Sequence, residues 1–161
     1  MPQENIDNFP FPALALPPAP LQLRHSDSTK GDFEVFDTLR RKWLVLTPEE
    51  WVRQNFVHYL ISQLGYPAGL VANEYGIRLN RTLRRCDTVV FDRTLRPAVI
   101  VEYKAPSVAI TQRVFDQIAR YNIVLQSRYL IVSNGLEHYC CRFSGSAYTF
   151  LPALPTYSEL Q

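Results

Sequence analysis

The residues best suited to chemistry are two carboxylates and a lysine in two consecutive apolar segments. Asp87 lies in RCDTVVF (85–91), and Glu102 and Lys104 lie at the end of AVIVEYK (98–104). Both segments are rich in β-branched residues, which predicts strands. Because side chains alternate along a strand, Glu102 and Lys104 share one face. If the two strands pair as a hairpin, Asp87 lies beside Glu102.

Two facing carboxylates in an apolar sheet indicate a metal site, because unpaired buried charge is costly. Oxygen ligands select a hard divalent cation such as Mg²⁺ or Mn²⁺. The alternative is a set of edge charges or a salt bridge, since an Asp followed at a distance by Glu-x-Lys is a short pattern. Gln117 and Tyr121 form a second polar pair, four residues apart and therefore on one side of a predicted helix. The alternative for this pair is a core tyrosine with a surface glutamine.

Helices and strands alternate along the part of the chain that carries these residues. A helix is predicted from Thr47 to about Leu64, because Thr47 is a good N-cap, Pro48 suits the first turn, and Glu50 completes a capping box. A second helix is predicted over 111–126. Strands are predicted at 70–77, 85–91, 98–103, 129–132 and 138–143. The order is therefore helix, three strands, helix, strands, which predicts an α/β fold.

The apolar stripe of the first helix contains two opposite charges, Glu49 and Arg53, four residues apart. Their position predicts a paired site on the inward face of the helix. Glu49 is favoured over Glu50 for a role at the site, because the capping box already accounts for Glu50. A structural ion pair between Glu49 and Arg53 is the alternative.

Composition and charge limit the class of protein. The chain has 161 residues, 47% of them apolar, and a net charge of +2. One domain is expected, and a disordered chain or a coiled coil is excluded. Fourteen of the seventeen basic residues are arginine, and four of them precede Asp87: Arg78, Arg81, Arg84 and Arg85. Such a cluster is either a strip that contacts phosphates or a solvated loop.

The two ends of the chain differ from its centre. Six of the twelve prolines fall in the first twenty residues, which predicts an extended arm over 1–32 whose Phe9 and Phe11 are able to pack on the surface. Residues 33–155 are predicted to be the folded domain and 156–161 a tail, with 151–161 a fraying loop. No signal peptide, membrane-length apolar run or cysteine framework is recognised, so a reduced cytoplasmic protein with no membrane partner is expected.

Several segments, in the same order along the chain, resemble a known family. Asp87, Glu102-Tyr103-Lys104 and Gln117-x-x-x-Tyr121 resemble the PD-(D/E)xK nuclease superfamily, with Cys86 in place of the proline. TPEEWVRQ, RCDTVVFD, VEYKAP, FDQIARYN and LIVSNG resemble the N-terminal nuclease domain of type I restriction enzyme R subunits (HsdR), in a small standalone form. The resemblance covers roughly residues 33–155.

The resemblance implies a restriction-endonuclease-like core with a mixed central sheet. It also implies that Asp87, Glu102 and the Tyr103 backbone carbonyl bind Mg²⁺ or Mn²⁺. Lys104 would activate water or stabilise charge at phosphorus. Gln117 and Tyr121 match an accessory motif beside the site, and the family has an acidic residue on its first helix that reaches the site, for which Glu49 is favoured.

The expected function is metal-dependent hydrolysis of DNA phosphodiesters, in the mode of an endonuclease. No GxxxxGK[ST] loop is present, so no ATP-driven motor is expected in this chain. A homodimer or a larger restriction-type complex is left open. Two alternatives remain: a catalytically inactive nucleic-acid-binding or assembly module of the same fold, and a structural protein whose proline-rich arm docks on a partner.

Overall fold

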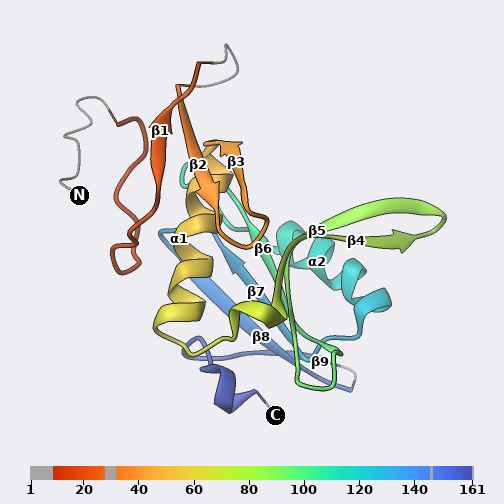
Figure 1. The fold of residues 1–161 in the computed structure, drawn as a ribbon. Coiled ribbons are helices and arrows are strands. Elements are labelled where there is room, and N and C mark those ends of the chain that lie inside the picture. The colour runs from red at the N-terminus through yellow and green to blue at the C-terminus, as the bar shows by residue number, and fades with distance from the viewer. Residues whose placement is uncertain (1–8, 28–31, 146, 161) are drawn as a thin grey trace.

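Figure 1 shows the computed structural model of the protein, which describes residues 9–27, 32–145 and 147–160. The predicted order of helix, three strands, helix and strands is confirmed as α1, β4–β6, α2 and β7–β9, so the fold is α/β. Among the described residues, no helix is long and apolar enough to span a membrane. The elements are β1 (Leu23–His25), β2 (Phe33–Asp37), β3 (Lys42–Val45), α1 (Pro48–Ser62), β4 (Val71–Leu79), β5 (Thr82–Phe91), β6 (Pro97–Tyr103), α2 (Gln112–Leu125), β7 (Tyr129–Ser133), β8 (His138–Ser144) and β9 (Ala147–Phe150), with short 3₁₀ helices at Ala68–Leu70 and Tyr157–Glu159.

The central sheet is mixed, with strands in the order β4-β5-β6-β7-β8-β9. Among the described strands, only β6 and β7 pair in parallel, and α2 connects them, because parallel neighbours need a long crossover. One buried cluster contains α1 residues such as Phe56 together with Val99 and Val101, and we call it the α1-side cluster. The other contains Ile100 and the α2 residue Ile118, and we call it the α2-side cluster. The alternation of β6 therefore gives the sheet two covered faces.

The hairpin of β4 and β5 reverses its faces halfway along its length. Val71 belongs to the α1-side cluster, but Ile77, six residues later on the same strand, belongs to the α2-side cluster. An even spacing would keep both on one face of a regular strand. The reversal coincides with Glu74, whose φ is 56° and which is missing from the ladder opposite Asp87. Asp87 therefore lies where the hairpin changes direction.

A small antiparallel sheet, β1-β2-β3, precedes α1 and was not predicted from the sequence. The proline-rich residues before it pack as expected on the body of the protein. Phe9 and Phe11 contact the ring of Trp51, whose Nε1 donates to the Pro12 carbonyl at 3.0 Å. The predicted arm also contains residues 28–31, which lie outside the described part of the chain, as do residues 1–8.

The turn between β7 and β8 is held by Asn134 and Gly135. Gly135 has a φ of 84°, and a Cβ atom there would lie 2.7 Å from a Leu14 methyl carbon. The positive φ favours glycine, a Cβ atom would force the Leu14 side chain to shift, and the Ala15 N–H donates to the Gly135 carbonyl at 2.8 Å. The N-terminal residues are therefore fitted against this turn.

The expectation that residues 151–161 form a loop is confirmed for the described residues 151–156, and a 3₁₀ helix follows at 157–159, but the expected fraying is wrong. Leu151, Leu154 and Tyr157 pack against the α1-side cluster. The Tyr66 hydroxyl donates to the Pro155 carbonyl at 2.9 Å, and the Tyr157 hydroxyl donates to Phe91. The Leu151 N–H also donates to the Cys140 carbonyl at 2.8 Å and the Tyr157 N–H to the Leu64 carbonyl at 2.9 Å, so apolar contacts and hydrogen bonds together fix this segment. The predicted boundaries at residues 32 and 155 remain predictions.

Candidate metal and catalytic site

The antiparallel pairing of β5 and β6 brings Asp87 to Glu102. Thr88 pairs with Val101 and Val89 with Ile100, so one further step along the ladder sets Asp87 opposite Glu102. The Tyr103 N–H donates to Asp87 Oδ2 at 2.9 Å, and Lys104 Nζ lies 3.7 Å from Glu102 Oε1. The hairpin that the sequence predicts therefore brings all three candidate side chains to one place.

Of the two carboxyl groups of the site, Glu102 is buried and Asp87 is half-buried, and each has few hydrogen-bond partners. Glu102 is 6% exposed, and burial raises its pKa to about 8; the charge of Asp87 adds to the shift and Lys104 opposes it. Burial also raises the pKa of Asp87, against the opposing effects of the Tyr103 N–H and of Arg53. Two carboxyl groups in this state favour either a shared proton or a cation.

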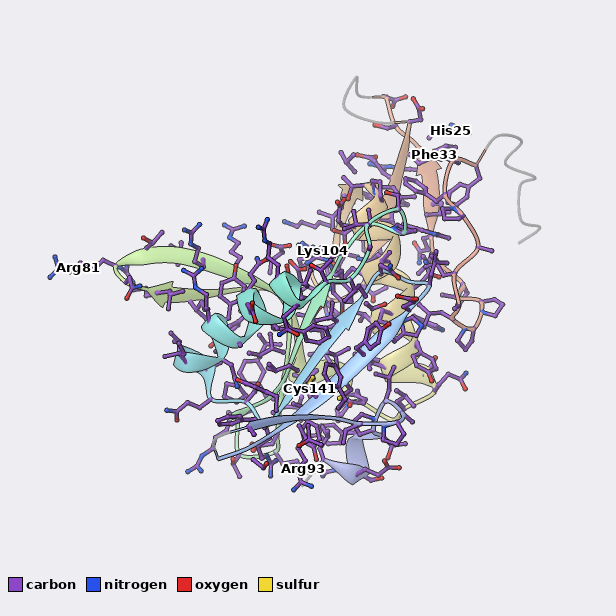
Figure 2. All side chains as sticks on the ribbon, turned by 180° about the vertical axis from the view of Figure 1, so that it is seen from behind. His25, Phe33, Arg81, Arg93, Lys104 and Cys141 are labelled. Atoms are coloured by element: carbon purple, nitrogen blue, oxygen red, sulfur yellow. The ribbon has the colours of Figure 1, made fainter. Side chains whose placement is uncertain are left out.

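The backbone at the end of β6 fixes the position of Lys104. Its N–H donates to the Ser133 carbonyl at 2.9 Å, so the ladder with β7 continues beyond the last residue of β6. The Asn134 side chain then donates to the Val108 carbonyl at 2.9 Å and holds the loop that follows. Lys104 keeps its side chain half-buried beside Glu102. Figure 2 shows it in the central part of the molecule.

Arg53 of α1 reaches the same strand from the other side of the sheet. Its side chain is buried, and Nη1 donates to the Asp87 carbonyl at 3.0 Å while Nη2 lies 2.6 Å from Glu74 Oε1. Burial lowers the pKa of Arg53, but the charges of Glu50, Asp87 and Glu74 outweigh this effect and raise it. Arg53 therefore anchors both strands at the point where their faces reverse.

The expectation that Glu49 faces inward with Arg53 is wrong. Glu49 is exposed, whereas Glu50 is buried and its Oε1 lies 3.5 Å from Arg53 Nε. The cap itself is present, because Thr47 accepts a hydrogen bond from the Glu50 N–H at 3.1 Å. The Glu50 carboxylate, however, accepts hydrogen bonds from Arg40 at 3.0 Å and Gln54 at 2.8 Å. These two donors draw the capping-box residue into the interior.

Asp37, which sequence reasoning did not single out, is the centre of a buried polar network. It is 1% exposed and accepts hydrogen bonds from the N–H groups of Leu39 and Arg40 at 2.8 Å each. The Arg40 guanidinium donates at 2.6 Å, and the side chains of Gln54 and Asn73 donate at 3.1 and 3.2 Å. Although burial raises the pKa of Asp37, these bonds outweigh it and lower the pKa below 3.8. Only the Asp-x-x-Arg spacing of residues 37–40 could have indicated this centre.

The network extends from Asp37 to the candidate site. The Thr88 hydroxyl donates to Asn73 Oδ1 at 2.7 Å, and the Tyr103 hydroxyl donates to Thr88 at 3.0 Å. Tyr103 is the residue whose backbone N–H holds Asp87. The Asp37 network therefore reaches β6 at Tyr103, the residue between Glu102 and Lys104.

Gln117 and Tyr121 lie half-buried on α2 and bond to each other, with Gln117 Nε2 donating to the Tyr121 hydroxyl at 3.3 Å. The shared face that their spacing predicts is therefore present. In the described part of the chain, neither residue forms a hydrogen bond or ion pair with Asp87, Glu102 or Lys104. Their accessory role stays a prediction.

The donor set at the site is small. The described residues contain no group of three or more His, Cys, Asp or Glu side chains that could hold a metal ion. Burial raises the pKa of the neighbouring Cys86 to about 12, with Glu102 and Asp87 adding to the shift, so a thiolate ligand is disfavoured. The donors that remain are the carboxylates of Asp87 and Glu102 and the Tyr103 carbonyl expected from the sequence. Hard oxygen donors of this kind suit Mg²⁺ or Mn²⁺.

The comparisons with known proteins agree with this fold. The fold is shared with a fragment of a putative HsdR subunit of a type I restriction enzyme from Vibrio vulnificus YJ016, with a TM-score of 0.54 and 17% identity. The match covers 71% of this chain and 24% of that one, so this chain spans about a quarter of its length. No curated protein matches. The family described as "Type I restriction enzyme R protein N terminus (HSDR_N)" matches residues 48–155, and the chain belongs to that family.

Proposed function

We propose that this protein is a divalent-metal-dependent nuclease that hydrolyses DNA phosphodiester bonds at Asp87, Glu102 and Lys104. The observation that carries the proposal is the juxtaposition of a buried and a half-buried carboxyl group, Glu102 and Asp87, with a half-buried lysine. Membership of the R-subunit N-terminal family supports nuclease chemistry and a DNA substrate. The longer HsdR chain it resembles supports action within a larger restriction-type complex.

Residues of this chain would bind the divalent cation and place a positive charge beside the phosphate. Asp87 and Glu102, with the Tyr103 carbonyl, would hold Mg²⁺ or Mn²⁺, which when bound supplies charge neutralisation and a more acidic water. Burial keeps the Glu102 carboxyl group away from bulk water, so it lacks the hydration that would compete with a ligand. Lys104 presents a fixed positive charge beside them, which suits the negative charge that develops on a phosphate in the transition state.

Plasmid cleavage tests the proposal directly. We expect the wild-type protein to cleave DNA with Mg²⁺ or Mn²⁺, and Asp87→Ala and Lys104→Ala to reduce the rate by about 10²-fold or more. Glu49→Gln is the matched control, because Glu49 is exposed, and should cleave at the wild-type rate. Equal cleavage by all of these proteins would show that the activity comes from another site or a contaminant.

An inactive nucleic-acid-binding or assembly module is the second candidate. It is favoured by the small donor set and by the Lys104–Glu102 ion pair, which already offsets part of the carboxylate charge. This candidate predicts DNA binding without cleavage in either metal, and without any effect of Asp87→Ala on binding. The cleavage experiment therefore separates the two functions.

A further inference from the structure

The outer half of the β4–β5 hairpin extends away from the rest of the protein (Figure 1). We call residues 76–85 the arginine hairpin. It contains four arginines and no Asp or Glu, and all four arginine side chains are exposed: Arg78, Arg81, Arg84 and Arg85. Figure 2 shows Arg81 at its tip, far from Lys104. A projecting ribbon with charge of one sign is complementary to a polyanion.

The ladder places the arginines on both faces of the ribbon. Arg78 pairs with Leu83, and Gly76 pairs with Arg85, so these residues share one face. Arg84 pairs with Ile77 on the other face, and Ile77 is buried in the α2-side cluster. The base of the hairpin is therefore anchored, and its outer part presents basic groups on both faces.

Arg81 occupies a backbone position that favours glycine. Leu79 pairs with Thr82, which leaves a two-residue turn of Asn80 and Arg81 with φ values of 50° and 65°. Two-residue turns with both central φ values positive commonly end in glycine, because a Cβ atom is disfavoured there. The fold alone therefore favours glycine at position 81, and the arginine carries a charge to the most distant point of the hairpin.

The hairpin is continuous with the candidate site. Arg85 precedes Asp87 by two residues and Arg81 precedes it by six, on the same strand or its turn. At ~3.3 Å per residue, the tip lies about 20 Å from Asp87 along the strand. This length corresponds to about six base pairs of B-form DNA.

We propose that the arginine hairpin lies in a groove of duplex DNA and holds the duplex about six base pairs from the bond that is cut. The choice of DNA rests on the proposed nuclease function. A two-stranded ribbon fits the major groove of B-DNA, which is ~12 Å wide. The major groove of A-form RNA is too narrow for side chains to read. Leu83, 62% exposed between Arg78 and Arg85, offers an apolar contact to thymine methyl groups.

The test measures binding of a fluorescent DNA duplex of about two helical turns, in EDTA so that cleavage does not enter. Arg81→Gly removes the charge and relieves the backbone, so we expect affinity to fall about tenfold and the salt slope to fall by about one, with urea stability unchanged or higher. Asn80→Gly is the matched control, with the same backbone relief and no change in charge. Arg93→Ala removes an exposed arginine that lies at the bottom of the view in Figure 2, away from Arg81, and should leave affinity unchanged.

Each contrary result identifies which idea fails. Unchanged affinity in Arg81→Gly, an equal loss in Arg93→Ala, or equally tight binding of duplex RNA would overturn the hairpin proposal, even if the protein cleaves DNA. Hairpin-dependent binding without cleavage in Mg²⁺ and Mn²⁺ would instead overturn the nuclease function, and with it the distance to a cut bond, while the binding of duplex DNA by the hairpin would stand.

Discussion

Two carboxylate centres are connected through Tyr103, and they differ in how many hydrogen bonds their carboxylates accept. Asp37 receives five hydrogen bonds, two from backbone N–H groups and three from side chains, and its pKa is lowered. Asp87 accepts one backbone N–H, Glu102 has the Lys104 ammonium at 3.7 Å, and the two carboxyl groups hydrogen-bond to each other; burial raises both pKa values. The first centre is complete without a ligand, whereas the second has oxygen atoms left to bind one.

The comparison separates a structural charge from a functional one. A buried carboxylate that serves only stability gains from every donor it can collect. A carboxylate that is to bind a cation must keep acceptor atoms free, and it carries an energetic cost until the cation arrives. The Asn73–Thr88–Tyr103 chain connects the two, so the complete centre supports the incomplete one.

The largest effect on stability is expected when the complete centre is broken. Asp37→Asn should lower the free energy of unfolding by about 3 kcal/mol, because it leaves Arg40 and the amides of Gln54 and Asn73 without their acceptor. Urea unfolding near neutral pH measures this change.

The same measurement on Asp87→Asn should show a change below about 1 kcal/mol, because an amide oxygen still accepts from the Tyr103 N–H and repulsion from Glu102 is relieved.

The pH dependence gives an independent check on Asp37. Its folded pKa lies below 3.8, so the ionised form stabilises the protein above that pH, and the benefit is lost as pH falls through the folded pKa. The stability difference between wild type and Asp37→Asn should therefore shrink below about pH 4. A difference that persists at full size in acid, or an Asp87→Asn protein as unstable as Asp37→Asn, would remove the contrast between the two centres.

A smaller effect on stability is expected at the start of α1, where the buried Glu50 is compared with the exposed Glu49. Glu50→Gln should cost about 2 kcal/mol, because Glu50 is buried and its charge meets Arg40 and Arg53. Glu49→Gln should change stability by less than about 0.5 kcal/mol, because Glu49 is exposed. Thermal unfolding of the two variants side by side measures the difference. The reverse order would restore the inward role that the sequence predicts for Glu49.

The elements and the convergence at the site could be predicted because they depend on local patterns. Apolar strands, the Thr47 cap and the spacing of Asp87 from Glu102 and Lys104 are all properties of short segments. The hydrogen bonds of Asp37 could not be predicted, because its partners Gln54 and Asn73 lie 17 and 36 residues away. The preference for Glu49 over Glu50 was wrong for a related reason. Periodicity places a residue on a helix face but does not show which hydrogen-bond donors lie near it, here Arg40 and Gln54 beside Glu50.

The exchange of the two faces of the β4–β5 hairpin at Glu74 also could not be predicted from the sequence. A non-glycine residue with positive φ inside a strand breaks the alternation on which strand predictions depend. The packing of Leu154 and Tyr157 was missed because prolines indicate a loop and say nothing of its contacts. Both features became visible only from tertiary contacts.

Calorimetric titration with Mn²⁺ tests the central claim, that Asp87 and Glu102 form a cation site that is kept incomplete by the fold. We expect the wild-type protein to bind Mn²⁺, and Glu102→Gln and Asp87→Asn to lose binding while remaining folded. Glu50→Gln, which alters a buried carboxylate outside the site, should bind as the wild type does. Binding that persists unchanged without the Glu102 carboxylate, or no binding by the wild type, would contradict the account.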